Sequence, residues 1–164
     1  MQEPMPDTLT QASLGTLAAA VRRRMKHVVG TRLAPYDLTL QQFWVILVLL
    51  EQGPSSLHPL AQQVWMDDPT ASRVVKAMVA RGLLRTQPDP RHGRRILISL
   101  TPEALPLAEN LKGLATEIRS GLVAGLAPEV EATVRQGLFT MIANLDDMLE
   151  AVPSSAPGET AVAP

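Results

Sequence analysis

The sequence predicts a mainly α-helical protein that contains one small β-hairpin. Apolar residues recur at helical spacing in most of the chain, and only one short stretch combines β-branched residues with flanking turn signals. Capping residues, Pro and Gly stand at the expected ends of the helical stretches. A length of 164 residues, with 46% apolar and 19% charged residues, suits one globular domain.

The first predicted helix is long and amphipathic. Within residues 9–30, apolar side chains follow a three-and-four spacing that places them on one helical face: Leu14, Leu17, Ala18, Val21, Met25 and Val28. We therefore expect a tail at residues 1–8 and a helical segment at residues 9–34, which Pro35 interrupts.

A second helix is expected to begin after Thr39. Thr is a good N-cap, and Gln42 three residues later completes a capping-box pattern. The run FWVILVLL that follows is apolar nearly all round, so this helix should be buried and should end at Gly53.

Two further helices are expected before the hairpin. Ser56 caps a short one, which packs through Leu60, Ala61 and Val64. Asp68 is the expected N-cap of the next, with Pro69 at its first position and Gly82 just past its end. Its inward residues would be Ala71, Val74, Val75 and Met78, and its outer residues would be Thr70, Ser72, Arg73 and Lys76.

The hairpin is predicted from LLRTQ and ILISL, two strand-like segments, with DPRHGRR as the tip between them. Residues 101–151 then form two helices, which begin near Thr101 and at Pro128 and carry apolar stripes. Residues 152–164 are rich in Pro, Ser and Ala, and we expect them to be disordered.

Several classes of protein are disfavoured by what the sequence lacks. There is no cysteine for thiolate chemistry, no secretion signal, and no apolar run of the roughly 20 residues that a membrane-spanning helix needs. The three His residues are scattered, and no nucleophile elbow or phosphate-binding loop is present. We expect a cytoplasmic protein that is not an enzyme and needs no metal or cofactor.

Charge is unevenly distributed, although the net charge is only −1. Residues 69–99 hold seven Arg or Lys residues and one Asp, a net charge of +6, whereas the residues from 101 onward hold three basic and nine acidic ones, a net charge of −6. A local basic face is typical of nucleic-acid binders.

The order of helices and basic hairpin is that of a winged helix-turn-helix. In this motif one helix enters the major groove, while the hairpin reaches the backbone or the minor groove.

These segments resemble the multiple-antibiotic-resistance regulator (MarR) family of transcription factors. LTLQQFWVILVLLEQGPSSLHPLAQQV resembles its second and third helices, DDPTASRVVKAMVARGLL its recognition helix, and DPRHGRRILISLTPEA its wing. The resemblance implies a winged helix-turn-helix at residues 35–100. It also implies that Thr70, Ser72, Arg73 and Lys76 lie at the major groove, and that Arg91 lies at the wing tip with Asp89 and Arg94 bracing the loop. Arg95 extends the basic wing.

The resemblance also implies a homodimer and a small lipophilic or phenolic effector. Residues 9–34 and 101–151 would form the dimerisation helices, because a small winged domain cannot cover their apolar stripes. Trp44 is either a core residue or part of an effector crevice; the effector-binding residues are otherwise unknown. The function that follows is a sequence-specific repressor, which an effector releases from a pseudo-palindromic site on double-stranded DNA. The alternative is a winged-helix protein-interaction module that does not bind DNA.

Overall fold

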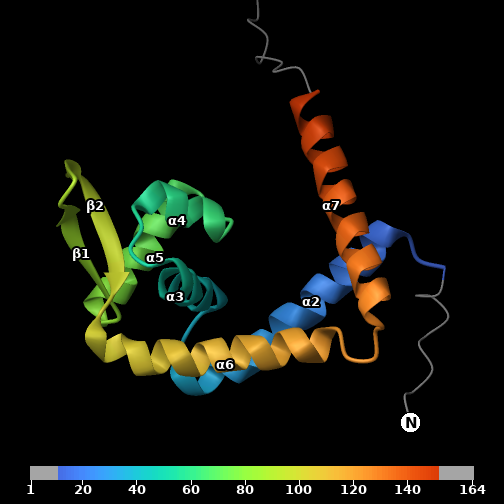
Figure 1. Ribbon diagram of the computed structural model, residues 1–164, viewed down its shortest axis with the longest axis horizontal. Helices are drawn as coiled ribbons and strands as arrows, with labels where there is room; N and C mark the ends of the chain where they lie inside the picture. The colour runs from blue at the N-terminus through green and yellow to red at the C-terminus, as the bar shows by residue number, and fades with distance from the viewer. Residues whose placement is uncertain (1–10, 152–164) are drawn as a thin grey trace, which may run out of the picture. The chain divides into compact units, whose positions relative to one another are not determined.

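The computed structural model describes residues 11–151, apart from the side chains of His92 and Arg94. Its elements are α2 (Leu14–Leu33), η1 (Ala34–Tyr36), α3 (Leu40–Gln52), α4 (Leu57–Gln63), α5 (Asp68–Ala80), β1 (Leu84–Asp89), β2 (His92–Leu100), η2 (Pro102–Ala104), α6 (Leu105–Leu122) and α7 (Pro128–Glu150) (Figure 1). The predicted fold class, helices with one antiparallel hairpin, is confirmed. The chain divides into two compact units, residues 1–119 and 120–164. The tails expected at residues 1–8 and 152–164 lie outside the described residues.

Helix α2 begins after Ser13, whose hydroxyl accepts a hydrogen bond of 3.2 Å from the backbone N–H of Thr16. Its buried residues are Ala20, Val29 and Leu33. Leu17 and Met25 of the predicted stripe are half-buried and its other members are exposed, so the first unit leaves most of the stripe uncovered, as expected from the sequence. The face that packs on the core lies beside the predicted one, and the stripe is left without a cover.

Helix α3 lies at the centre of the first unit and contacts α2, α4, α5 and β2. Its capping box is confirmed: Gln42 N–H donates to Thr39 Oγ1 at 3.2 Å, and Thr39 N–H donates to Gln42 Oε1 at 2.9 Å. The helix is mostly buried, as the apolar run predicts. Trp44 is the exception, with 39% of its surface exposed, so the interpretation of Trp44 as a core residue is wrong.

Helices α4 and α5 form the expected helix-turn-helix, with one correction at the start of α5. Asp67, and not Asp68, is the N-cap, and its carboxylate accepts a hydrogen bond of 2.7 Å from Thr70 N–H. Asp68 and Pro69 are the first two helical residues. Proline is tolerated throughout the first turn, where backbone N–H groups have no helical partner, so the position of Pro69 does not fix the cap.

The hairpin has longer strands and a shorter tip than predicted. Leu84 pairs with Leu100 and Pro88 with Ile96, and the register shifts before Asp89 pairs with His92. Pro88 is accommodated because both strands of a two-stranded sheet are edge strands, where proline, which has no N–H to donate, is tolerated. A bridge from Ser55 to Ile98 ties the segment before α4 to β2.

The core of the first unit joins these elements. Its largest fully buried side chains are Phe43, Leu33, Ile46, Leu60, Met78, Leu84, Leu111 and Val45. They come from α2, α3, α4, α5, β1 and α6, so the two helices of the helix-turn-helix are held on a common support. Helix α6 is also tied to α2 by an exposed ion pair in which Arg32 Nη2 lies 2.7 Å from Glu117 Oε1.

The second unit consists mainly of α7, which begins at Pro128 as predicted. None of its residues is buried. Apolar side chains that are 43% to 73% exposed recur along it: Val130, Val134, Leu138, Phe139, Ile142, Leu145, Met148 and Leu149. Among the described residues no single helix is long and apolar enough to cross a membrane; α2 with η1 and α3 pass that test only together, across an 81° bend.

Candidate nucleic-acid interface

The outward face of α5 is basic. Ala71, Val75 and Met78 are buried, and at 3.6 residues per turn the direction opposite to them falls between Arg73 and Lys76. Both of these side chains are exposed. The structure therefore positions two cations at the middle of the face that is turned away from the core, as the sequence predicts for a groove-facing helix.

Thr70 and Ser72 lie at the two margins of that face, and both are half-buried. Thr70 and Arg73 are in direct contact, because Arg73 Nη2 donates a hydrogen bond of 3.2 Å to Thr70 Oγ1. Thr70 is therefore held between its own backbone contact with Asp67 and the Arg73 guanidinium. These contacts limit the directions in which the Arg73 side chain points.

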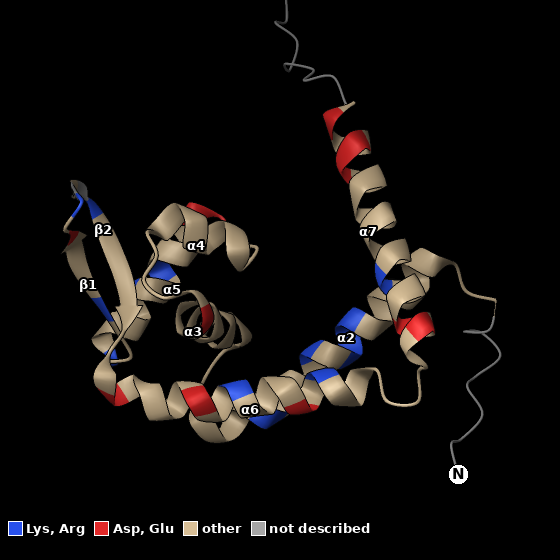
Figure 2. Cartoon of the chain, viewed as in Figure 1, with Lys and Arg blue, Asp and Glu red and all other residues tan. Residues whose placement is uncertain are grey.

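The hairpin carries the second group of predicted residues. Arg91 is exposed on the two-residue turn, and its backbone N–H donates a hydrogen bond of 2.8 Å to Asp89 Oδ1. Arg95 is exposed on β2. Arg94 lies on the same strand, but its side chain is outside the described part of the structure. Figure 2 shows basic residues on the hairpin and on α5.

Two carboxylates stand at the start of α5, close to the basic face. The hydrogen bonds from the backbone and side chain of Thr70 hold the pKa of Asp67 below its ordinary value, since they stabilise the charged form. The Asp68 carboxylate lies 3.1 Å from Nδ1 of His58 on α4. Both carboxylates are therefore engaged by groups of the protein itself.

Sequence reasoning missed three features of this region. The pairing of His58 with Asp68 joins residues of two helices and has no local signal, so the sequence alone leaves this His isolated. Arg85 donates to Ser99 Oγ across the hairpin at 3.2 Å, a contact that depends on the strand register. Trp65 is exposed in the turn of the helix-turn-helix. The sequence offers one signal for this exposure: Trp65 lies near two Gln and two Asp residues and belongs to no apolar stripe.

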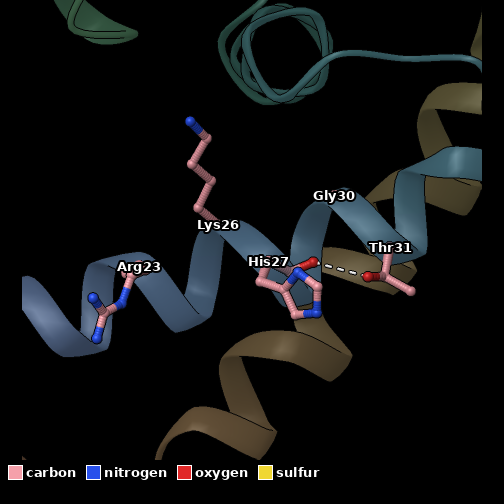
Figure 3. Close-up of a pocket in the computed structure, with 5 residues that line it drawn as sticks. All are labelled: Arg23, Lys26, His27, Gly30 and Thr31. Atoms are coloured by element: carbon pink, nitrogen blue, oxygen red, sulfur yellow. Dashed lines mark hydrogen bonds between the residues drawn. The ribbon is translucent and has the colours of Figure 1, made fainter.

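Two open hollows occur among the described residues. One, of about 440 Å³, lies between the start of α3 and α5 and is lined in part by Thr39, Gln42, Thr70 and Arg73. The other, of about 500 Å³, lies on a single face of α2, where the side chains of Arg23 and Lys26 point in different directions (Figure 3). Both are open to solvent, and only the first adjoins the basic face of α5.

Within the described residues, no group of three or more His, Asp or Glu side chains is placed to hold a metal ion.

Part of the chain matches a known protein family. The model of the MarR family matches residues 36–95, which run from the end of η1 through α3, α4 and α5 into β2. This segment, less than half of the chain, is similar to the MarR family. The predicted resemblance is thereby confirmed for the part of the chain that contains the basic helix and hairpin.

Solved structures of other proteins are similar to most of the chain. A probable transcriptional regulator from Pseudomonas aeruginosa is 27% identical, with a TM-score of 0.69 over 80% of this chain and 98% of its own. BpsR of Bordetella bronchiseptica, described as regulated in its DNA binding by 6-hydroxynicotinic acid, is 27% identical, with a TM-score of 0.70 over 85% of this chain and 97% of its own. The MepR–DNA complex of Staphylococcus aureus, at 21% identity, shares the fold, with a TM-score of 0.75 over 82% of this chain and 99% of its own.

Proposed function

We propose that this chain is a homodimeric regulator of the MarR type that binds a pseudo-palindromic operator in double-stranded DNA. Helix α5 is the recognition helix, with Thr70, Ser72, Arg73 and Lys76 at the major groove. Arg91, Arg94 and Arg95 of the hairpin contact the backbone or the minor groove. Because its target is DNA, we infer a cytoplasmic location.

The observation that carries the proposal is the face of α5 opposite Ala71, Val75 and Met78. A helix in the major groove must be fixed from behind and must present donors in front, since base edges are read by side chains at close range. Arg73 and Lys76 occupy that front, and Arg is the commonest partner of guanine. A protein-interaction module would have no need of this basic face or of an exposed Arg91 on the adjoining hairpin.

A second copy of the chain is the proposed cover for the exposed apolar residues of α7 and α2. Leu138, Leu145 and Met148 of α7 are 43%, 58% and 66% exposed, and they recur at helical spacing. An apolar stripe of this length on a soluble helix indicates an interface. A two-fold dimer would also explain a pseudo-palindromic operator, since two identical recognition helices read two identical half-sites.

The proposed mode of regulation is repression that a small lipophilic or phenolic effector relieves. The precedent is BpsR, whose DNA binding is described as regulated by 6-hydroxynicotinic acid. An effector releases DNA only if it binds the free conformation more tightly than the DNA-bound one. It would act by changing the separation of the two α5 helices in the dimer.

Selection of bound sequences from random duplex DNA tests the proposal. The expected result is a two-fold-symmetric motif with half-sites about one helical turn apart. Enrichment of an asymmetric motif would contradict the proposed dimer, and no enrichment at all would contradict sequence-specific binding and favour the protein-interaction module.

A further inference from the structure

Trp65 lies in the turn between α4 and α5 and is 89% exposed, the largest exposed fraction among the large apolar side chains that the structure describes. Exposure of single apolar residues is common, but an indole buries a large area when it has a partner. The turn itself does not supply one. Trp65 is therefore an aromatic side chain held in solvent beside the start of the recognition helix.

The backbone of Trp65 is in the left-handed region, with φ of 56°. Trp65 N–H donates to Gln62 O at 3.2 Å and Met66 N–H donates to Ala61 O at 2.9 Å, which is the Schellman pattern of a helix C-terminus. The same pattern ends α5, where Gly82 N–H donates to Val79 O and Leu83 N–H to Met78 O. Gly82 adopts φ of 70° there without strain, whereas a bulky side chain at this position is strained.

The two turns thus have the same geometry and opposite residue choices. Glycine satisfies the geometry at the end of α5, and nothing in the backbone at the end of α4 calls for an indole. Burial does not offset the strain, because the side chain is in solvent. Strained residues of this kind concentrate at functional sites, so the strained backbone of Trp65 indicates a role for its side chain.

The position of the turn indicates the partner. Trp65 is two residues before Asp67, the N-cap of α5, so their Cα atoms are separated by at most two peptide units of about 3.8 Å each. In a helix-turn-helix the first residues of the second helix meet base edges, and the first helix crosses the DNA backbone. A side chain at the turn between them is therefore at the rim of the groove, where sugars and phosphates lie.

Charge at the turn favours a neutral hydrogen-bond donor. Asp67 and Asp68 would repel a phosphate, although Thr70 and His58 already engage them. An indole offers one uncharged N–H donor and a flat apolar ring, so it can donate to a phosphate oxygen while the ring packs on a deoxyribose. It can do both without adding to the charge of the recognition helix.

We propose that Trp65 is a positioning residue for DNA, whose indole N–H binds a backbone phosphate and whose ring packs on the adjacent sugar. This inference rests on the proposed DNA-binding function and deepens it. The contact fixes how far the start of α5 enters the groove. It contributes to binding on every duplex, because sugars and phosphates carry no base identity.

Fluorescence tests the contact directly, since the chain contains only two Trp residues. In a Trp44→Phe variant the emission comes from Trp65 alone. Titration with the selected operator duplex should shift this emission to shorter wavelength or quench it, saturating with the binding curve. If the operator binds and the emission stays unchanged, the contact does not exist. An equal change on raising the protein concentration without DNA would assign Trp65 to self-association and overturn the proposal.

Substitutions of Trp65 in the otherwise wild-type chain separate the effect of the indole on DNA binding from the effect of the strained backbone on stability. Trp65→Gly should raise Tm, because Gly tolerates the left-handed backbone. It should also weaken operator binding by at least about 100-fold, because each of the two subunits loses the ring packing and a hydrogen bond to a charged group that is worth about tenfold. Trp65→Phe should weaken binding less, since it keeps a ring and removes only the N–H. The salt dependence of binding should not change, because no charge is removed.

Two results distinguish failure of this inference from failure of the proposed function. A Trp65→Gly variant that is more stable and binds as tightly as the wild type overturns the inference and leaves the proposed function in place. Wild-type protein that binds no duplex overturns both.

Discussion

The carboxylate of Asp67 accepts a hydrogen bond of 2.7 Å from the backbone N–H of Thr70, which closes the first turn of α5. Thr70 in turn accepts a hydrogen bond from Arg73 at 3.2 Å. The N-cap that starts α5 is therefore connected through one residue to the cation at the centre of its outward face. A change at Asp67 should act on both the stability of the helix and the orientation of Arg73.

We predict that Asp67→Ala lowers Tm by about 2–4 °C, since removal of an N-cap leaves a backbone N–H of the first turn without its partner. Asp68→Ala is the matched control, because it removes the neighbouring carboxylate but no cap; its exposed contact with His58 contributes little. Thermal unfolding followed by circular dichroism measures both. An equal decrease of Tm in the two variants would contradict the assignment of the cap to Asp67.

The cap should also make stability depend on pH. The pKa of Asp67 is lower in the folded protein than its ordinary value, so its stabilisation is present above about pH 4 and is lost as pH falls through the lowered pKa. Asp67→Asn keeps an N-capping side chain that does not titrate. The difference in Tm between the wild type and Asp67→Asn should therefore fall as the pH is lowered from about 6 to about 2.5. A constant difference would contradict this origin of the pKa shift.

We predict a dimer that depends on the apolar stripe of α7. Leu138→Asp should yield monomers or unfolded protein, because the new charge would enter an apolar interface. Gln136→Asp is the control. Gln136 lies roughly opposite Leu138 around the helix, so this substitution adds the same charge outside the stripe. Sedimentation gives the mass and circular dichroism the helix content. A wild type that is monomeric at micromolar concentration rules out the proposed interface.

Local signals predict the elements of this fold well. The capping box of Thr39 and Gln42 and the start of α7 at Pro128 depend on residues close together in sequence, and both are found where expected. The exposed cations Arg73 and Lys76 follow from the period of α5. These features need only short-range geometry, which residue type and spacing determine.

The errors concern features that depend on tertiary structure. Spacing predicts the apolar stripe on α2, but it does not predict that Val29 and Leu33 are the α2 residues that pack in the core. Asp67 and Asp68 are equivalent candidates before Pro69, and the chain direction at the turn decides between them. The left-handed backbone of Trp65 belongs to the turn that ends α4, and the sequence gives no signal for it because glycine, not an indole, is the usual residue there.

DNA binding should depend strongly on salt, because residues 69–99 have a net charge of +6 and each neutralised phosphate releases counterions. A dimer that makes about 6 to 10 phosphate contacts should bind roughly 10³- to 10⁵-fold more weakly at about 200 mM than at about 50 mM salt. Binding titrations at several salt concentrations measure the slope. A flat response would show that the basic residues of α5 and the hairpin do not meet phosphates.

Helix α5 and the hairpin should contribute to DNA binding in different ways. Arg73→Ala should weaken binding to the preferred site by about 1–3 kcal/mol and relax the preference at one or two base positions in each half-site. Arg91→Ala should weaken specific and unrelated duplexes more evenly and make the salt slope shallower by about one unit for each phosphate that is no longer neutralised. Arg135→Ala on α7 removes the same charge outside the proposed interface with DNA and serves as the control.

The most direct test is therefore to measure the wild type and these three variants on the selected operator and on a scrambled duplex at two salt concentrations. We expect Arg73→Ala to reduce the ratio of specific to nonspecific affinity, Arg91→Ala to reduce both affinities, and Arg135→Ala to leave both unchanged. If neither Arg73→Ala nor Arg91→Ala changes either affinity, the outward face of α5 and the hairpin are not the DNA-binding surface.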